Sequence, residues 1–511
     1  MTWHVALMKS RWKITGGLIA LAIVGAAILF RSDRSEQEAL EETRRELRRL
    51  GFRIDLTEFS CSTSRELRAR AGALTIIGHA VQAHSPDDLI LLTPVGSNAA
   101  AVVWKQDKLA GRDGEDMWPI LRESLRESRA LYENRPDLDA ACEAALSGPI
   151  RFDVNTSAGH NMLLPHLEAL KRLAQTLGAR AVVELHDGNN DAAWTNLLAA
   201  TRLATAWDPE PAEVSHLVRY ACATTAYDVT WQALQAGGWT DEQLERLQRE
   251  WESVDFFKGL PETAAFTRAS AVATCQLERQ QLLTFFMMLK QTLRAPRYAW
   301  DRLTDYWRQL RYRHHGTYED EKALLLHCRD RELELRRAIQ SPTWSQMRQF
   351  PGTTNMIPFQ SKYPSRMQTM MNMRQILLAS QLYAQGQGQG FLGRAADAEA
   401  HRRIIIAVTA LERYHLRHGS YPNTLQELAP EWLQNPPSDF MDGNPLRYHR
   451  TDDGHFVLYS VGLDCVDNGG EMSRPRRAGA PGEVAGAFGM QQAVDLVWPL
   501  PASVAAVRSQ E

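Results

Sequence analysis

Oxygen-bearing side chains near the end of the chain have the types and spacing that calcium prefers. Asp464, Asp467 and Asn468 place three hard oxygen ligands within five residues, and Asp495 follows in a later apolar stretch, from which it could close the site. Calcium takes about six to eight oxygens in a flexible cage. The loop is not an EF-hand, because its twelfth position counted from Asp464 is Pro475 instead of a bidentate Glu. On the residues alone, a calcium site and a solvated acidic turn both remain open.

Two other patterns that could bind a ligand have simpler explanations. Gly388–Gly393 matches G-x-G-x-x-G, a dinucleotide-binding motif that requires a preceding strand. A helix is predicted before it, inside Gly-Gln repeats, so we interpret it as a flexible hinge. The histidines from His314 to His327 lack the His-x-x-x-His spacing that places two imidazoles on one helix face, so we predict no metal role for them. The chain also lacks a G-x-S-x-G nucleophile motif, and a protein that is not an enzyme is favoured.

A helix and three strands are predicted around the acidic loop. Apolar residues recur at helical spacing within His401–His418, and Gly419 follows where a left-handed cap favours glycine. Leu446–Arg450 and His455–Val461 are strand-like and flank Asp-Asp-Gly, in which Asp-Gly suits a tight hairpin turn. Val494–Leu500 could add a third strand. These elements predict a small α+β unit with an antiparallel sheet.

The order of motifs in this unit resembles a known family. The motifs are Leu-Glu-x-Tyr-x-x-x-x-Gly-x-Tyr-Pro-x-Thr-Leu-x-Glu-Leu from Leu411, Asp-Gly-Asn-Pro-Leu-x-Tyr from Asp442 and Leu-Tyr-Ser-x-Gly-x-Asp from Leu458. Together they resemble the globular head of the major pseudopilin of bacterial type II secretion systems, over about the last fifth of the chain. The resemblance implies that the loop after the last motif binds calcium, with Asp464, Asp467, Asn468 and Asp495 as the ligands.

The chain departs from that family in two ways. The family's loop carries more acid, whereas three arginines follow here between Arg474 and Arg477, and their charge would weaken cation binding. Pseudopilins also begin with a processed Gly-Phe junction, a Glu at the fifth mature position and a membrane helix that continues into the head. The membrane segment of this chain has no such Glu and lies hundreds of residues before the unit. We therefore do not expect it to assemble as a usual pseudopilus subunit.

The N-terminus contains a predicted membrane anchor. Ile14–Phe30 is 17 residues without a charge, which is just long enough to cross a bilayer. A cleaved signal peptide is the alternative, with a small-residue site at Gly25–Ala27, but apolar residues continue past that site. Basic residues on both sides leave the orientation open. The short N-terminal tail and the resemblance to an exported module favour a single-pass protein of the bacterial inner membrane with its body in the periplasm.

We predict a mainly α protein in five parts. They are an anchor (1–31), a charged stalk helix at Ser35–Leu50 with a mixed segment (32–110), an antiparallel helical array with a proline-rich linker (111–393), the pseudopilin-like unit (394–501) and a tail (502–511). Short breaks between the helices of the array imply antiparallel neighbours. The whole layout resembles uncharacterised membrane-anchored helical proteins of bacterial envelopes.

Composition narrows the function to a few classes. The formal net charge of -3 argues against general nucleic-acid binding, and the six cysteines show no C-x-x-C spacing for a zinc or thioredoxin-type site. We predict an envelope scaffold or interaction protein with a calcium-binding, pseudopilin-like module, connected to type II secretion or pilus-like systems and to protein partners in the envelope. The alternative is a hydrolase acting on an envelope polymer, with its active site in the helical region.

Overall fold

The computed structural model describes residues 35–81, 99–109, 115–130, 138–280, 312–350, 390–470 and 495–501. The predicted anchor at Ile14–Phe30, most of the proline-rich linker and the tail lie outside these residues. Within the described parts, none of the helices is both long and apolar enough to span a membrane.

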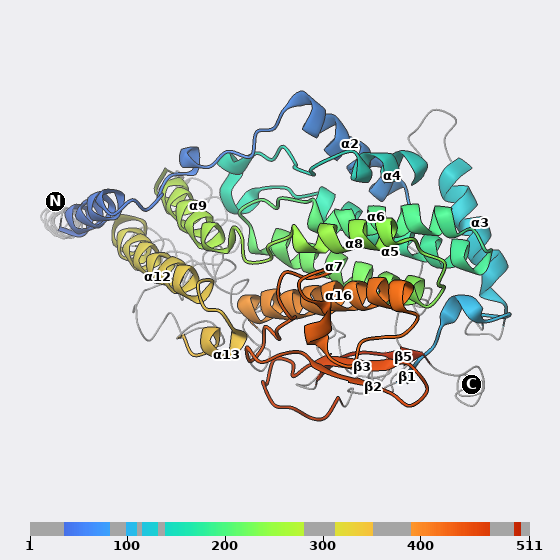
Figure 1. The fold of residues 1–511 in the computed structure, drawn as a ribbon. Helices are drawn as coiled ribbons and strands as arrows, with labels where there is room; N and C mark the ends of the chain where they lie inside the picture. Colours follow the sequence, from blue (N-terminus) through green and yellow to red (C-terminus); the bar gives the residue numbers. More distant parts are fainter. Residues whose placement is uncertain are drawn as a thin grey trace, which may run out of the picture.

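The centre of the protein is an array of antiparallel helices, which confirms the mainly α fold class (Figure 1). Helices α5, α6 and α7 pack against one another, α2 and α4 cover one side of this trio, and α8 lies on the other side. The helices of the array are α2 (Arg65–Ala80), α3 (Met117–Ala130), α4 (Leu138–Leu146), α5 (His166–His186), α6 (Asn190–Thr205), α7 (Glu213–Leu234) and α8 (Asp241–Glu252).

The pattern of leucines in α5 explains its position in the centre. Leu167, Leu170, Leu173 and Leu177 follow helical spacing, and all four are buried in the main hydrophobic core. The helix ends where Gly188 adopts a positive φ of 77°, a conformation that costs glycine little. Because this break is only three residues long, α6 must return beside α5, as predicted.

Two predictions for the N-terminal part were incomplete. Residues 35–49 form a helix, but it is not a solvated stalk, because Leu40 and Leu47 pack against Val272 of α9 (Leu260–Gln280) and Leu325 of α12 (Thr317–Ala338). The mixed segment contains α2, which sequence reasoning missed. Its other regular elements within 52–81 and 99–109 are the short strand β1 (Ala99–Ala100) and 3-10 turns.

The C-terminal unit, which we define as residues 390–470 and 495–501, has the predicted order of helix, hairpin and strand. Strand β3 pairs antiparallel with both β2 and β4, and Gly419 caps α16 with a φ of 70°. The helix starts ten residues earlier than the apolar pattern indicated, so the end of the predicted hinge forms its buried first turn. The elements are α16 (Phe391–His418), a 3-10 turn (Leu425–Leu428), β2 (Arg447–Arg450), β3 (Phe456–Ser460), β4 (Leu496–Trp498) and β5 (Leu500–Pro501).

The C-terminal unit shares its core with the helical array. Helix α16 lies between α7 and α8 on one side and the sheet on the other (Figure 1). The Trp231 indole of α7 donates a hydrogen bond to the Pro499 carbonyl at 2.8 Å, and β5 pairs in parallel with β1. Apolar residues of both parts form one continuous cluster. The unit is therefore held in place by the array.

Candidate functional site

The acidic loop leaves β3 and returns at β4, and glycine backbones give it its shape. Gly462, Gly469 and Gly470 have φ values of 67°, 73° and 80°, which residues with a Cβ rarely adopt. A Cβ on Gly470 would also lie 3.2 Å from the Tyr459 ring. Both the curvature and the close approach therefore require glycine.

Asp495 closes the loop as the sequence predicted, although it does so by binding backbone amides. Its carboxylate is 5% exposed and accepts hydrogen bonds from the Asn468 N–H at 3.0 Å and the Gly470 N–H at 2.7 Å. Burial raises the pKa of Asp495, and the negative charges of Asp467 and Asp464 raise it further. The three predicted carboxylates are thus close enough to repel one another.

The other three predicted ligands have protein partners as well. Asp467 accepts hydrogen bonds from the Gly469 N–H, the Tyr459 hydroxyl and Arg447 Nε, each at 3.0 Å, and bonding to these donors lowers its pKa. Asp464 accepts the Val466 N–H at 3.0 Å, and the Asn468 side-chain amide donates to the Val466 carbonyl at 3.2 Å. Among the described residues, which exclude 471–494, no group of three or more Asp, Glu, His or Cys side chains has the arrangement of a metal site.

Sequence reasoning missed Arg447, whose positive charge pairs with three of the acidic side chains in and beside the loop. Its guanidinium donates to Asp439 at 3.2 Å and to Asp442 at 2.7 Å, in addition to Asp467. These three acids raise the pKa of Arg447, so it stays charged and neutralises part of the loop. The motif from Asp442 to Tyr448 contains this arginine at its variable position. A basic residue within an acidic motif was the sequence feature that could have pointed to it.

Asp439 is the second residue that sequence reasoning missed. It is fully buried and accepts hydrogen bonds from the Ser460 hydroxyl at 2.7 Å, the Val461 N–H at 3.0 Å and the Met441 N–H at 2.9 Å. These bonds join the start of the acidic loop to the turn before β2. The loop is therefore preorganised by protein groups.

The residues that fit calcium best are Asp464 and Asp495, with the Asn468 side-chain carbonyl and backbone carbonyls available nearby. Their carboxylates are the hard oxygen donors that calcium selects, and each oxygen has lone pairs beyond those used by the backbone amides. Asp467 fits less well, because Arg447 already supplies a positive charge to it.

Two motif residues of the C-terminal unit, Glu412 and Tyr421, form a hydrogen bond at 2.8 Å between the tyrosine hydroxyl and the carboxylate. Burial raises the pKa of Glu412 from 4.5 to about 7, and the bond from Tyr421 opposes this rise. A carboxyl whose pKa is higher in the folded state favours folding when it is protonated. Its contribution is complete below about pH 4.5 and is lost as the pH rises through about 7.

Replacing Glu412 with Gln is therefore expected to stabilise the protein at pH 8.5 by about 2–3 kcal/mol and to leave its stability at pH 4.5 nearly unchanged. Chemical denaturation across this pH range measures the effect. Glu431→Gln, at an exposed position of the same unit, is the control and should keep the parent's pH dependence. Parallel curves for Glu412→Gln and the parent would contradict the assignment.

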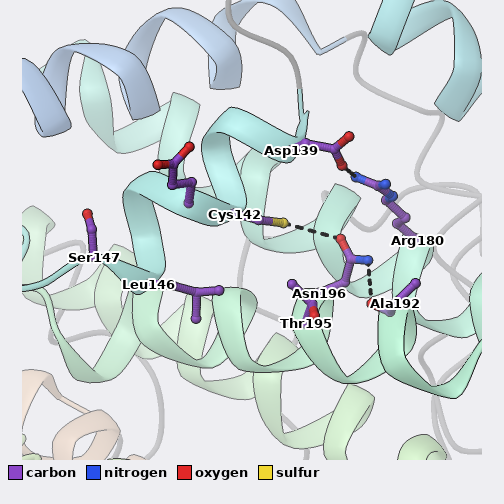
Figure 2. A pocket seen from close by; sticks show the side chains of 9 residues that line it. Asp139, Cys142, Leu146, Ser147, Arg180, Ala192, Thr195 and Asn196 are labelled. Atoms are coloured by element: carbon purple, nitrogen blue, oxygen red, sulfur yellow. Dashed lines mark hydrogen bonds and ion pairs between the residues drawn. The ribbon is translucent and has the colours of Figure 1, made fainter.

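A cavity of about 610 Å³ lies where α4 faces α5 and α6 (Figure 2). Asp139 of α4 pairs with Arg180 of α5 at 2.7 Å, and the Cys142 thiol contacts the Asn196 side-chain oxygen at 3.4 Å. Asn196 in turn donates to the Ala192 carbonyl at 2.7 Å. These polar groups hold the three helices together, and their pairing supports no acid/base role of the kind that a hydrolase would need.

Fold and site together define a class: a mainly helical protein with a small C-terminal α+β unit that contains a preorganised acidic loop. No family model, no curated protein and no solved structure matches this chain.

Proposed function

We propose that this protein is a scaffold or interaction protein of the bacterial envelope, connected to type II secretion or pilus-like systems. In this proposal the N-terminal segment anchors it in the inner membrane and the body lies in the periplasm. The order of α16, the β2–β3 hairpin and β4 around the acidic loop supports the pseudopilin-like part of the proposal.

The packing of α16 is the observation that carries the proposed role. In pseudopilins the helix of the head continues from the membrane segment, and the filament is built from such helices. Here α16 begins at Phe391 and is buried between the array and the sheet, with Ile404, Ile405 and Leu411 inaccessible to solvent. A helix used inside its own chain is not free to pack in a filament. This favours a stationary partner of such assemblies over a subunit.

The proposal also includes calcium binding at the acidic loop. Asp464 and Asp495 are its main carboxylate ligands, and Asn468 and backbone carbonyls complete the shell. Asp467 contributes negative charge that Arg447 partly neutralises. When bound, calcium would offset the charge repulsion that adds to burial in raising the pKa of Asp495, and it would stiffen the loop.

Calcium is expected to raise the melting temperature of the detergent-solubilised full chain more than magnesium does. A cation that binds only the folded state stabilises it by about 2.7 kcal/mol at a free concentration one hundred times the dissociation constant. We expect that constant to be about 10⁻⁴ to 10⁻³ M, as in other extracellular modules. Asp464→Ala should abolish the response, whereas Asp452→Ala, at an exposed position of the hairpin turn, should retain it. Identical melting in calcium and in chelator would refute this part of the proposal.

The scaffold role is tested with a tag placed after Glu511. Cross-linking in intact cells, followed by purification from membranes, should recover a component of a secretion or pilus-like assembly. Release of soluble fragments from isolated envelope polymer by the purified protein would instead support the hydrolase alternative.

A further inference from the structure

A second cavity, of about 310 Å³, lies far from the acidic loop in sequence. It forms where the 60–62 segment meets residues 151–152, the 208–211 segment and the start of α9. Its walls include the aromatic rings of Phe59 and Phe152. Four segments of the chain therefore converge on one hollow.

Glu210 supplies a buried carboxylate to this cavity. Its side chain is 2% exposed, and its Oε2 accepts no hydrogen bond from the described residues. Its Oε1 pairs with Nε2 of His166 at 3.0 Å, and this imidazole is itself buried and stacked on Phe152 at 4.0 Å. A buried carboxylate oxygen without a hydrogen-bond donor is costly. The site therefore lacks a donor to Oε2 that water or a ligand would supply.

Other buried polar atoms without partners gather in the same stretch of chain. Among the described residues they include the Trp207 indole N–H, the Ser215 hydroxyl and both ring nitrogens of His216. The His216 ring lies directly behind Gly259, a wall residue, since a Cβ there would be 3.4 Å from the ring. Unsatisfied buried groups are uncommon in folded proteins, so the open Glu210 oxygen in this cavity and the His216 ring behind its wall indicate a site built for a further molecule.

The charges around the cavity indicate what that molecule carries. Arg151 and Lys258 both pair with Asp208, the latter at 3.6 Å, and the Arg53 guanidinium lies 4.3 Å above the Phe59 ring. These cations therefore have other partners within the described residues, and none of them is paired with Glu210. Apart from His166, the carboxylate lacks a compact cationic donor. An ammonium group has three N–H donors and a full charge, which suits a carboxylate with several open lone pairs.

We propose that this cavity binds a small primary amine, with its ammonium group on Glu210 and its carbon chain between Phe59 and Phe152. The volume suits a molecule of a few carbons, and aromatic walls favour an apolar chain next to a cationic head. This binding site is separate from the scaffold role and from the acidic loop.

Three four-carbon probes test the chemistry on the full chain by calorimetry and thermal denaturation. n-Butylammonium is expected to bind and to raise the melting temperature, whereas n-butanol and butyrate should do neither. Glu210→Gln should weaken butylammonium binding at least tenfold. Glu262→Gln removes an exposed carboxylate from the same cavity and should leave binding unchanged. Equal binding of the alcohol, no binding of the amine, or equal effects of the two variants would overturn the proposal.

Cys61 gives a second readout that does not depend on the folding of a variant. Its half-buried thiol lines the cavity, whereas Cys465 is half-buried in the C-terminal unit. Butylammonium should slow iodoacetamide alkylation of Cys61 several-fold and leave that of Cys465 unchanged, as measured by peptide mass analysis. Unchanged alkylation of Cys61 at a butylammonium concentration that saturates the calorimetric signal would place the amine elsewhere and overturn the proposal.

The pKa of the Cys61 thiol also tests whether Glu210 lies close to Cys61 in the cavity. Burial, followed by the negative charge of Glu210, raises the pKa of Cys61 to about 11. Glu210→Gln should therefore lower this pKa and speed alkylation of Cys61 at pH 9 without any ligand, whereas Glu262→Gln should not. An unchanged rate in a folded Glu210→Gln protein would remove Glu210 from the cavity and with it the proposed amine site.

Discussion

Replacing Glu321 with Ala is expected to lower the free energy of unfolding by about 3–5 kcal/mol. Glu321 of α12 is fully buried and is bound by two arginines, Arg44 Nε at 2.8 Å and Arg279 Nη2 at 2.7 Å. Removing the carboxylate takes the Glu321 counter-charge from Arg279 and leaves Arg44 with its less buried partner Glu41, in a region of low dielectric. The same change loosens the helix at residues 35–49, because Arg44 is one of its links to the body.

The matched control for this prediction is Glu41→Ala. Glu41 also pairs with Arg44, at 2.7 Å, but its side chain is 45% exposed, so we expect a loss of less than about 1 kcal/mol. Urea denaturation of both variants and the parent measures the difference. A loss for Glu321→Ala as small as that for Glu41→Ala would show that the buried carboxylate adds no stability.

The second large effect is expected for Trp251→Ala, at about 3–5 kcal/mol. Trp251 is 1% exposed on the buried face of α8, the helix that packs along α16, and its carbonyl accepts a hydrogen bond from Arg402 at 3.0 Å. The cavity left by the indole would lie next to the region where the array and the C-terminal unit meet. Because the two share one core, we expect both to unfold together and at a lower denaturant concentration.

Helix content and limited proteolysis of residues 390–470 report on the two parts separately. In Trp251→Ala both signals should shift together, whereas Leu416→Ala, at an exposed position of α16, should shift neither by more than about 0.5 kcal/mol. Two transitions, with only one of them moved by the substitution, would mean that the C-terminal unit folds independently.

Local patterns were sufficient for most helices of the array and for the three-stranded sheet of the C-terminal unit. The leucine spacing of α5, the Asp-Gly turn between β2 and β3 and the Gly419 cap each act within a few residues, so a short stretch of sequence contains their cause. Helix α2 was missed because its apolar and charged residues do not separate clearly onto two faces. The helix at residues 35–49 was expected to be solvated because its many charges conceal two buried leucines.

The candidate sites also combine features that the sequence predicts with features that only packing determines. The positions of Asp464, Asp467 and Asn468 in one glycine-bounded loop follow from their spacing, and Asp495 joins them through the pairing of β4 with β3. Arg447 reaches Asp467 across 20 positions of sequence, and Glu210 and Cys61 share a cavity although about 150 residues separate them. Local sequence patterns cannot predict contacts between residues this far apart in sequence, because such contacts depend on how whole elements pack.

The sequence by itself thus determined which segments are helical, where the hairpin turns and which loop collects acidic oxygens. These follow from backbone sterics, capping and periodicity, which act over one or two turns of chain. Only the tertiary structure decided that Arg447 neutralises part of the loop, that α16 is buried within its own chain, and that Glu210 is buried with one oxygen open. Burial and charge pairing are properties of contacts between distant segments, and packing alone sets which contacts form.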